Sequence, residues 1–456
     1  MGFFMEITYP PKVKTIIDKL QDAGFEAYAV GGCVRDSILG IVPNDWDITT
    51  NALPPDVKAL FRRTIDIGIK HGTVKVMIGN DGYEITTYRI DGQYEDSRHP
   101  SSVTFTAELA EDLRRRDFTI NAMAYSEKTG LVDMFGGMDD LKNGLIRAVG
   151  DARERFSEDA LRILRALRFS ARFGYDIEEE TQRAITELAP NLSNISAERI
   201  REELEKLVCS DHPDRLRTAY ELGVTAVIFP EWDDMMKCDQ NTPHHFTNVG
   251  DHTIVTLEYV IEEDKKLSVA ADKVLRLSAL LHDIAKPVKK TTGDDGVDHF
   301  RGHPGAGEKM AGDFLRRLKY DNDTINRVKS LVKYHDELPG NTYPSVRRFI
   351  VKVGKSNMDS LIRLKYADLY AHARYRWEEK MEGLRSLEEM YGNICAKEDC
   401  LTVKDLAVNG HDLISEGISP GPAVGRQLEA LLERVLDDPS MNDKDTLLEI
   451  VRAGNR

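Results

Sequence analysis

Hydrophobic and polar positions follow strand patterns in parts of the first 150 residues and helix patterns in most of the remaining chain. Strands are expected at 28–30, 72–78 and 83–89, and the turn sequence at 79–82 joins the last two into a hairpin. Apolar residues at helical spacing predict helices in the same region at 13–23, 54–61 and 113–125. Helical periods then dominate from residue 151 into the C-terminal segment, where a helix is expected at 426–436.

A strand-to-helix turn near residue 31 carries the first candidate chemistry. Residues 28–30 are apolar, Gly31 and Gly32 permit a tight turn, and residues 34–39 restart as a helix. Gly32 and Arg35 would therefore lie where backbone N–H groups and a guanidinium point at an arriving anion. Paired glycines after a strand, taken alone, indicate no more than a turn.

Acidic residues follow this turn closely. Asp45, Trp46 and Asp47 are expected to open the next strand, with both carboxylates on one face because strand side chains alternate. Two neighbouring carboxylates repel unless a cation lies between them, and hard oxygen ligands suit Mg²⁺. Glu84, on the strand 83–89, is either a third carboxylate of this site or an exposed edge residue. A phosphate-binding turn followed within about 20 residues by a carboxylate pair is the plan of a nucleotidyl-transfer site.

Residues 157–168 are the second informative stretch. Asp159, Arg162 and Arg165 recur at three-residue intervals near one face of the expected helix, with Arg168 close by. An Asp acceptor beside an Arg donor matches the amino group and ring nitrogen that cytosine and adenine share, and it would reject uracil and guanine. The alternative is an ordinary ion-pair ladder on a helix surface.

Composition limits the class of protein. With 456 residues, 41% of them hydrophobic, and a formal net charge of −15, we expect a soluble protein of several domains rather than a general nucleic-acid coat. Local basic stretches remain, notably the three arginines at 114–116, one of which could hold a triphosphate. No apolar run approaches the roughly 18 residues of a membrane span. Five scattered cysteines without a Cys-x-x-Cys pair indicate reduced thiols in the cytoplasm.

Five motifs occur in a fixed order: Gly31-Gly-Cys-Val-Arg-Asp36, Asp45-Trp-Asp47, Arg115-Arg-Asp-Phe-Thr-Ile-Asn121, Asp133-Met-Phe-Gly-Gly137 and Glu158-Asp-Ala-Leu-Arg162. Together they resemble the class II tRNA nucleotidyltransferases, the CCA-adding enzymes, which form a superfamily with bacterial poly(A) polymerases. The resemblance implies an α+β head with the mixed sheet and helices of polymerase-β-like nucleotidyltransferases, followed by all-α neck, body and tail domains. The expected divisions are 1–150, 151–215, 216–395 and 396–456.

The same resemblance implies roles for individual residues. Asp45 and Asp47 would ligate the catalytic Mg²⁺ ions, and Glu84 would supply the third carboxylate. The nucleotide would be held by two groups: Gly32, Arg35 and Arg116 at the triphosphate, and Asp159 and Arg162 at the base, with Arg165 and Arg168 in support. The implied reaction is attack of a tRNA 3′-hydroxyl on the α-phosphate of CTP or ATP, while the tail meets the tRNA.

A second constellation lies on helices between residues 216 and 395. Its members are His252, His282, Asp283, His303, His335 and Asp368. A single buried histidine is more often a satisfied core residue, but this set resembles the HD phosphohydrolase superfamily, including the extra histidines of its dinuclear variant. Such ligands suit a divalent transition metal such as Mn²⁺, Fe, Ni²⁺ or Co²⁺. The centre could hydrolyse a phosphomonoester or a cyclic phosphodiester, or it could be a degenerate domain that keeps its ligands for stability.

The function that the sequence favours is template-independent addition of CCA to tRNA 3′ ends from CTP and ATP, by a cytoplasmic enzyme that carries an HD domain. A poly(A) polymerase, or an enzyme that adds only CC or only A, is one alternative. The complete polar loop at 89–100 disfavours CC-only addition. The other alternative is an HD phosphohydrolase whose head only binds tRNA, and the pair of Asp45 and Asp47 counts against it.

Overall fold

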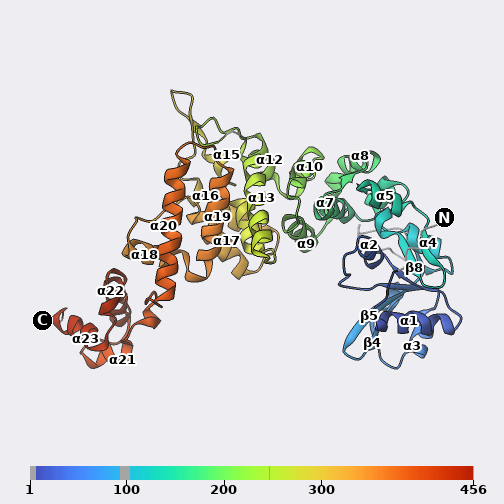
Figure 1. Cartoon of the computed structure of the whole chain (residues 1–456), viewed down its shortest axis with the longest axis horizontal. Coiled ribbons are helices and arrows are strands. Elements are labelled where there is room, and N and C mark those ends of the chain that lie inside the picture. The colour runs from blue at the N-terminus through green and yellow to red at the C-terminus, as the bar shows by residue number, and fades with distance from the viewer. Residues whose placement is uncertain (1–6, 93–102, 246, 455–456) are drawn as a thin grey trace. The chain divides into compact units, whose positions relative to one another are not determined.

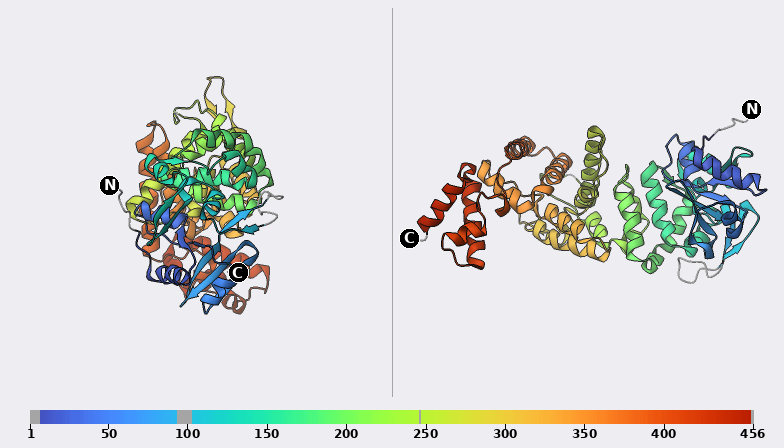
Figure 2. Two further views of the ribbon diagram at one scale, coloured as in Figure 1. Left: turned by 90° about the vertical axis from the view of Figure 1, so that its right-hand side faces the viewer. Right: turned by 90° about the horizontal axis from the view of Figure 1, so that it is seen from below.

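The computed structural model describes residues 7–92, 103–245 and 247–454, and it divides into two compact units, Met1–Pro230 and Glu231–Arg456 (Figure 1). The first unit contains a sheet with helices around it, and the second is helical apart from a short hairpin (Figure 2). The expected division into four domains is finer than this one and stays a prediction. Across the described ranges, no helix is long and apolar enough to cross a membrane.

Seven strands of the first unit form one mixed sheet in the order β3-β4-β5-β2-β1-β8-β9. Strands β2 and β5 pair in parallel, and the other neighbours pair antiparallel. The strands are β1 Ala27–Val30, β2 Ile48–Thr50, β3 Thr64–Gly68, β4 Thr73–Ile78, β5 Asp81–Thr87, β8 Met123–Ser126 and β9 Gly130–Asp133. The expected hairpin is confirmed as β4 and β5, and the mixed α+β head is confirmed with it.

Helices surround this sheet and then continue the unit. They are α1 Pro11–Asp22, α2 Gly32–Ile38, α3 Pro54–Leu60, α4 Leu109–Arg114, α5 Gly137–Asn143, α6 Ala152–Glu158, α7 Leu161–Phe173, α8 Glu179–Leu188, α9 Ala197–Val208, α10 Arg215–Glu221 and α11 Thr225–Ile228. A short parallel pair, β10 Leu145–Ile146 and β11 Asp176–Ile177, links α5 to the segment after α7. The expected helices at 13–23 and 54–61 are confirmed as α1 and α3.

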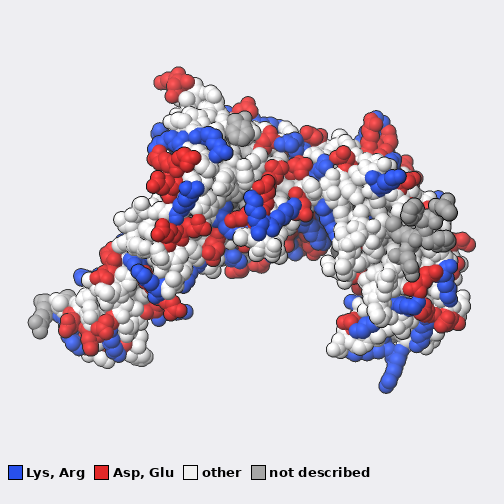
Figure 3. Space-filling view, viewed as in Figure 1, with Lys and Arg blue, Asp and Glu red and all other residues white. Residues whose placement is uncertain are grey.

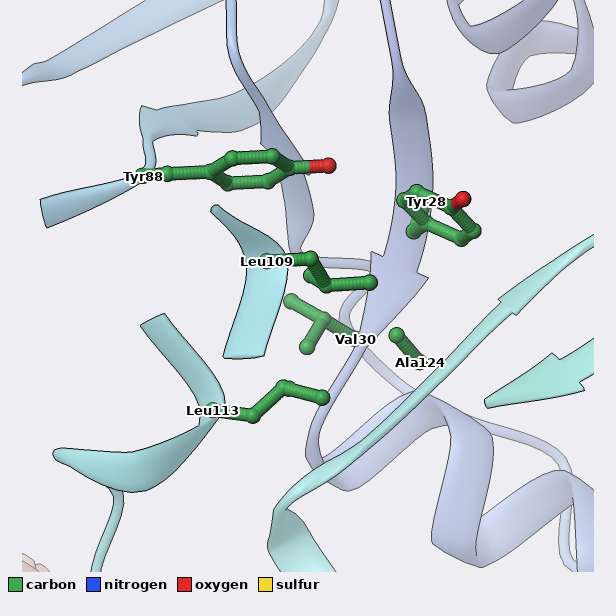
Figure 4. Close-up of a cluster of buried hydrophobic side chains, with 6 residues drawn as sticks. All are labelled: Tyr28, Val30, Tyr88, Leu109, Leu113 and Ala124. Atoms are coloured by element: carbon green, nitrogen blue, oxygen red, sulfur yellow. The ribbon is translucent and has the colours of Figure 1, made fainter. Parts of the chain in front are cut away.

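A buried apolar cluster fixes the end of β1 (Figure 4). Its members are Tyr28 and Val30 on β1, Ala124 on β8, Tyr88 after β5, and Leu109 and Leu113 on α4. Leu109 and Leu113 lie one helical turn apart, so α4 presents both side chains to the sheet. Because Val30 is held in this cluster, the turn that follows it has a defined position.

The expected helix at 113–125 was wrong. Helix α4 ends at Arg114, a 3₁₀ turn covers Thr119–Asn121, and the apolar run that follows is strand β8. The Asp117 carboxylate accepts the backbone N–H of Phe118, which stabilises the turn, and β8 pairs with β1. A short apolar run that is buried on both faces lacks the period that separates a strand from a helix.

The polar segment at 89–100 falls mostly outside the described residues, 93–100 being among those left out. Its start, Arg89–Asp91, forms strand β6 and pairs with β7, Val103–Phe105, so this part is not the loop that was expected. The use of this segment against CC-only addition therefore stays a prediction.

The second unit is built from helices. They are α12 Pro230–Lys237, which begins at the boundary, α13 Val249–Leu267, α14 Lys273–Leu281, α15 Lys286–Lys289, α16 His303–Arg317, α17 Asn322–Tyr334, α18 Tyr343–Val353, α19 Met358–Ala371, α20 Trp377–Ala396, α21 Gly410–Ser415, α22 Pro422–Asp437 and α23 Lys444–Gly454. The hairpin is β12 Thr291–Thr292 with β13 Asp298–His299. The expected helix at 426–436 lies inside α22.

On the face drawn in Figure 3, acidic and basic side chains are interspersed over both units. The formal net charge of the whole sequence is −15. Binding of a polyanion would therefore depend on local groups of side chains rather than on the charge of the whole chain.

Candidate functional site

The turn after β1 brings a glycine against an arginine. Gly31 has a φ of 80°, a left-handed backbone conformation that favours glycine, and α2 begins at the next residue rather than at 34. A Cβ atom at Gly31 would lie 2.8 Å from a terminal nitrogen of Arg116. Glycine at this position thus allows the Arg116 guanidinium to approach the backbone closely.

The two aspartates lie just before β2 rather than in it, because the strand begins at Ile48. Their alternation is nevertheless as expected: Trp46 is buried while Asp45 and Asp47 are exposed. The parallel pair of β2 and β5 aligns residue 48 with residue 85, so Asp47 continues the register toward Glu84. All three carboxylates line one cavity of about 800 Å³.

The electrostatics of this cavity favour a bound cation. The pKa of Asp47 is raised because the cavity walls withdraw water from its carboxylate, although the residue is exposed by surface area. The positive charge of Arg116 opposes that rise, and the negative charges of Glu84 and Asp45 add to it. Three carboxylates around one cavity offer hard oxygen donors, so the residues present fit Mg²⁺.

Arg116 has a donor to spare. Its Nε is buried and lacks a hydrogen-bond partner among the residues that the structure describes. Its NH2 lies 3.5 Å from a carboxylate oxygen of Asp112, which holds one end of the guanidinium. The structure therefore places Arg116 near the carboxylate pair with capacity for an anion.

Arg35 is held differently. Its side chain is buried, Nε donates to Asp36 at 2.8 Å, and NH1 donates to Asn121. The guanidinium also lies over the rings of Phe169 and Phe173, about 5 Å from each. These contacts occupy the groups that were expected to meet a triphosphate, and that role stays a prediction.

Asp159 does not lie on a helix face, which corrects the sequence analysis. Helix α6 ends at Glu158, Asp159 is extended with φ −142° and ψ 103°, and α7 begins at Leu161. The reason is local: one carboxylate oxygen of Asp159 accepts the N–H of Leu161 at 3.0 Å and starts the new helix. The other oxygen accepts from Arg199 at 2.6 Å.

The three arginines of α7 that the sequence analysis singled out are paired within the first unit. Arg162 donates to the backbone carbonyl oxygens of Arg155 and Arg115, each at 3.0 Å, and pairs with Glu158. Sequence reasoning missed the partners of the other two, since they lie far away along the chain. Arg165 donates to Asp117 at 2.7 Å, and Arg168 pairs with Glu203 at 2.6 Å.

Asp117 anchors this arrangement. Burial alone would raise its pKa, but the charge of Arg165 and hydrogen bonds from Asn121 and Arg165 lower it to about 2. Its carboxylate is therefore ionised in the folded chain over the whole neutral range, and it holds α7 against the turn that follows α4.

In the second unit, the structure brings all six expected His and Asp residues together. His282 and Asp283 directly follow α14, His303 begins α16, and His335 directly follows α17. His252 comes from α13 and Asp368 from α19, and a nitrogen and an oxygen of these two lie 2.9 Å apart. Two groups with converging ligand atoms result: His252, His282 and Asp368 in one, and Asp283, His303 and His335 in the other.

Asp283 belongs to one of these groups and also contacts His282 of the other. One of its oxygens is 3.1 Å from His282 Nε2, and the other is 3.4 Å from His303 Nε2 and 3.7 Å from His335 Nε2. A carboxylate placed in this way can serve two cations at once. Together with imidazole nitrogens, it forms a donor set that fits divalent transition metals.

Three of the histidines are oriented by backbone carbonyls. The Nδ1 atoms of His282, His303 and His335 lie 2.8, 2.9 and 2.7 Å from the carbonyl oxygens of Ala279, Phe300 and Val332, each three residues earlier. A carbonyl only accepts, so Nδ1 carries the hydrogen and the lone pair of Nε2 faces the centre. Burial lowers the pKa of His335 to about 4, so that ring is neutral and able to bind metal.

The same centre contains residues that sequence reasoning missed. His245, His372 and Lys286 line a cavity of about 440 Å³ together with Asp283, His303 and His335. Spacing along the chain could have revealed two of these residues. His372 is one helical turn after Asp368, and Lys286 follows Asp283 by three residues, with its Nζ 2.7 Å from the carboxylate. His245 offered a weaker signal, because it lies in an irregular segment before α13.

Comparison with known families gives three matches along the chain. The family models are the poly A polymerase head domain at residues 27–147, the RNA and SrmB-binding site of polymerase A at 174–236, and tRNA nucleotidyltransferase domain 2 at 303–451. A CCA-adding enzyme of Limosilactobacillus fermentum is 35% identical over 436 residues, which is 96% of this chain and 95% of that protein. The chain belongs to the CCA-adding enzyme family.

Two further relatives agree with this assignment. A CCA-adding enzyme of Leuconostoc mesenteroides is 54% identical over 208 residues, 45% of this chain and 52% of that protein. The solved structure of the Bacillus stearothermophilus CCA-adding enzyme in complex with CTP is 29% identical, with a TM-score of 0.74 over 98% of each chain. The family and the fold are therefore shared over nearly the whole length.

Proposed function

We propose that this chain adds CCA to the 3′ ends of tRNA from CTP and ATP without a template. The observation that carries the proposal is the convergence of Asp45, Asp47 and Glu84 on one cavity, in a chain that matches a CCA-adding enzyme over 96% of its length. The relative solved with CTP supports the choice of nucleotide. The tRNA, the second nucleotide ATP, and a location in the cytoplasm belong to the same proposal.

The residues of the chain have separate tasks in this reaction. Mg²⁺ bound by Asp45 and Asp47 would lower the pKa of the attacking 3′-hydroxyl and stabilise the leaving pyrophosphate. Glu84 fixes the charge and shape of that site from the neighbouring strand. Arg116, whose Nε has no partner among the described residues, binds the triphosphate. The Gly31–Gly32 turn leaves room for the Arg116 guanidinium.

Base choice would come from the turn between α6 and α7. Asp159 accepts from the exocyclic amino group that cytosine and adenine share, and Arg162 donates to the adjacent ring nitrogen. Arg162 is now held by carbonyl groups and by Glu158, so reading a base requires it to exchange partners. Arg165 and Arg168 would support the site by fixing α7.

The test is a transfer assay. The purified chain is given Mg²⁺, CTP and ATP with tRNA transcripts that lack the last three, two or one nucleotides, and the 3′ ends are sequenced. Ends that all finish in CCA and then stop support the proposal. Long A tails without added C would make the chain a poly(A) polymerase, and arrest after CC or failure to start without CC would identify a partial activity.

A second function is supported by the centre around Asp283. We propose that it binds two divalent transition-metal ions and hydrolyses phosphate esters, because Asp283 faces a ligand group on each side. Bound metal would supply Lewis acidity there. The test is metal analysis of the purified chain, followed by hydrolysis of a phosphomonoester and a cyclic phosphodiester over a series of metals. Absence of both metal and hydrolysis would leave the cluster as a structural remnant.

A further inference from the structure

One row of residues crosses the sheet of the first unit at the level of the carboxylates. The antiparallel register aligns Lys75 on β4 with Glu84 on β5, and the parallel register of β2 with β5 extends this row to Asp47. On the next strand, the backbone N–H of Val30 donates to the carbonyl oxygen of Asp47 at 3.0 Å. Aligned residues of neighbouring strands share a face, so Lys75 lies on the face that carries the carboxylates.

Lys75 is the cationic side chain of the carboxylate cavity. Among the described residues that line this cavity, it is the only Lys or Arg. Its Nζ lies 3.5 Å from a carboxylate oxygen of Glu84, which is longer than the roughly 2.8 Å of a charged hydrogen bond. The side chain is 33% exposed, so the ammonium can also donate to a substrate that enters the cavity.

Gly82 leaves room for the stem of Lys75 on β5. A Cβ atom at Gly82 would lie 2.9 Å from Cδ and 3.1 Å from Cε of Lys75, so the stem runs over this glycine, two residues before Glu84. Lys12 is engaged elsewhere, because it pairs with Asp81, another residue of the cavity wall. The two lysines therefore differ, and Lys75 is the one whose charge faces the carboxylates.

The strand order separates two ends of the site. Arg116, the proposed triphosphate ligand, lies against Gly31 after β1, whereas Lys75 lies on β4, with β2 and β5 between them. Strands β1 and β4 are three strand spacings apart, about 14 Å. In an in-line displacement, the attacking and leaving oxygens lie on opposite sides of the phosphorus. Because the pyrophosphate leaves toward Arg116, the RNA end approaches from the side of Lys75.

We propose that Lys75 binds the last phosphodiester of the RNA substrate and so holds the 3′-hydroxyl at the carboxylates. The inference rests on the proposed nucleotidyl transfer and adds to it a residue that binds the RNA rather than the incoming nucleotide. A lysine ammonium meets a phosphate as a point charge and reads no base. Lys75 therefore serves every step of the addition, whichever nucleotide ends the RNA.

The experiment removes the charge from each side of this contact in turn. Initial rates of CTP addition are measured on two tRNAs that lack the last three nucleotides, one natural and one with an uncharged methylphosphonate as its last linkage. For the unchanged chain, the neutral linkage is expected to raise the KM for RNA about tenfold, the equivalent of one charged hydrogen bond. Lys75→Met should show that rise already with natural RNA and no further rise with the neutral linkage, while the KM for CTP stays the same.

Two control variants locate the effect. Lys75→Arg keeps the charge and should still prefer the natural linkage. Lys128 lies in the turn between β8 and β9, toward the other edge of the sheet, and Lys128→Met should behave like the unchanged chain. A Lys75→Met variant that still distinguishes the two linkages tenfold would overturn the contact and leave Lys75 as a counter-charge for Glu84.

The unchanged chain separates the two proposals without any variant. If it adds nucleotides but uses both RNAs equally well, the inference about Lys75 fails and the proposed function stands. If it adds no nucleotide to the natural RNA, the proposed function fails and the inference fails with it.

Discussion

The two candidate centres of this chain offer a cation opposite kinds of donor groups. In the first unit, Asp45 and Asp47 lie just before β2 and Glu84 lies within β5, all three exposed around an open cavity of about 800 Å³. The His and Asp residues of the second unit lie in and at the ends of helices, mostly buried, and backbone carbonyls fix three of the rings. Hard oxygen donors in an open site suit an exchangeable Mg²⁺, whereas buried, pre-oriented imidazoles suit a tightly bound transition metal.

The difference also concerns what each centre must admit. A nucleotide and an RNA end need room and charge compensation, which an open cavity beside Arg116 offers. A rigid centre gains affinity by removing ligand freedom before metal binds. The contrast predicts that the two centres can be disabled independently, which Asp47→Ala and Asp283→Asn test.

The largest effect is expected for Asp47→Ala. Removing a ligand of the catalytic ions should lower nucleotide addition by roughly 10³-fold, because bound metal supplies several kcal/mol of stabilisation in such sites. Single-turnover addition of CTP to a tRNA transcript measures this loss. Hydrolysis of a phosphomonoester by the second unit should persist. Simultaneous loss of both activities would contradict the independence of the two centres.

Asp283→Asn tests whether the centre of the second unit can be disabled while nucleotide addition continues. In other metal sites, loss of a residue that only orients a ligand lowers metal affinity by about 10- to 100-fold. Asp283 is itself a candidate ligand, so its replacement should weaken Co²⁺ binding by about 100-fold. Calorimetric titration of the metal-free chain measures the change. Nucleotide addition should be unaffected in the same preparation, and a parallel decline there would show that the centres are coupled.

Asp117→Asn is expected to destabilise the first unit by about 2 kcal/mol, since the pKa of Asp117 falls from an ordinary value near 4 to about 2 on folding. The depressed pKa means that this stability is present above the unfolded value and is lost as pH falls from about 4 to about 2. Denaturant unfolding at pH 7 and pH 3 measures it. The exposed Asp22→Asn serves as control, and equal stability of the two variants at pH 7 would contradict the prediction.

The smallest effect concerns base choice. Asp159→Asn keeps the shape of the side chain but removes its charge, so discrimination against UTP should fall by about tenfold, the equivalent of one hydrogen bond. Misincorporation is measured with each of the four nucleotides in turn. Glu154→Gln, an exposed change on α6, should leave selectivity intact, and an unaltered preference in the Asp159 variant would assign base reading elsewhere.

Local spacing was enough to predict several features of both centres. Alternation put Asp45 and Asp47 on one side with Trp46 on the other, and the apolar helix before His282 ended where the His-Asp pair begins. Such features depend on backbone geometry over a few residues. The same reasoning failed where a side chain changed the local path. Asp159 accepts the N–H of Leu161 and lies outside both helices, and Asp117 stabilises a turn inside the run that had favoured one long helix.

The sequence by itself determined the residue types of the carboxylate group and of the six His and Asp residues, and it put Asp45 and Asp47 on one side of their segment. Only the tertiary structure decided which of them meet. His252 and Asp368 are separated by 116 residues and Arg165 and Asp117 by 48, yet each pair is in direct contact. The packing of Arg35 against two rings and the contact of His245 and His372 with His252 have the same origin. Side-chain spacing along a chain constrains neighbours within about one helical turn, whereas distant contacts follow from how apolar faces pack, which no local pattern encodes.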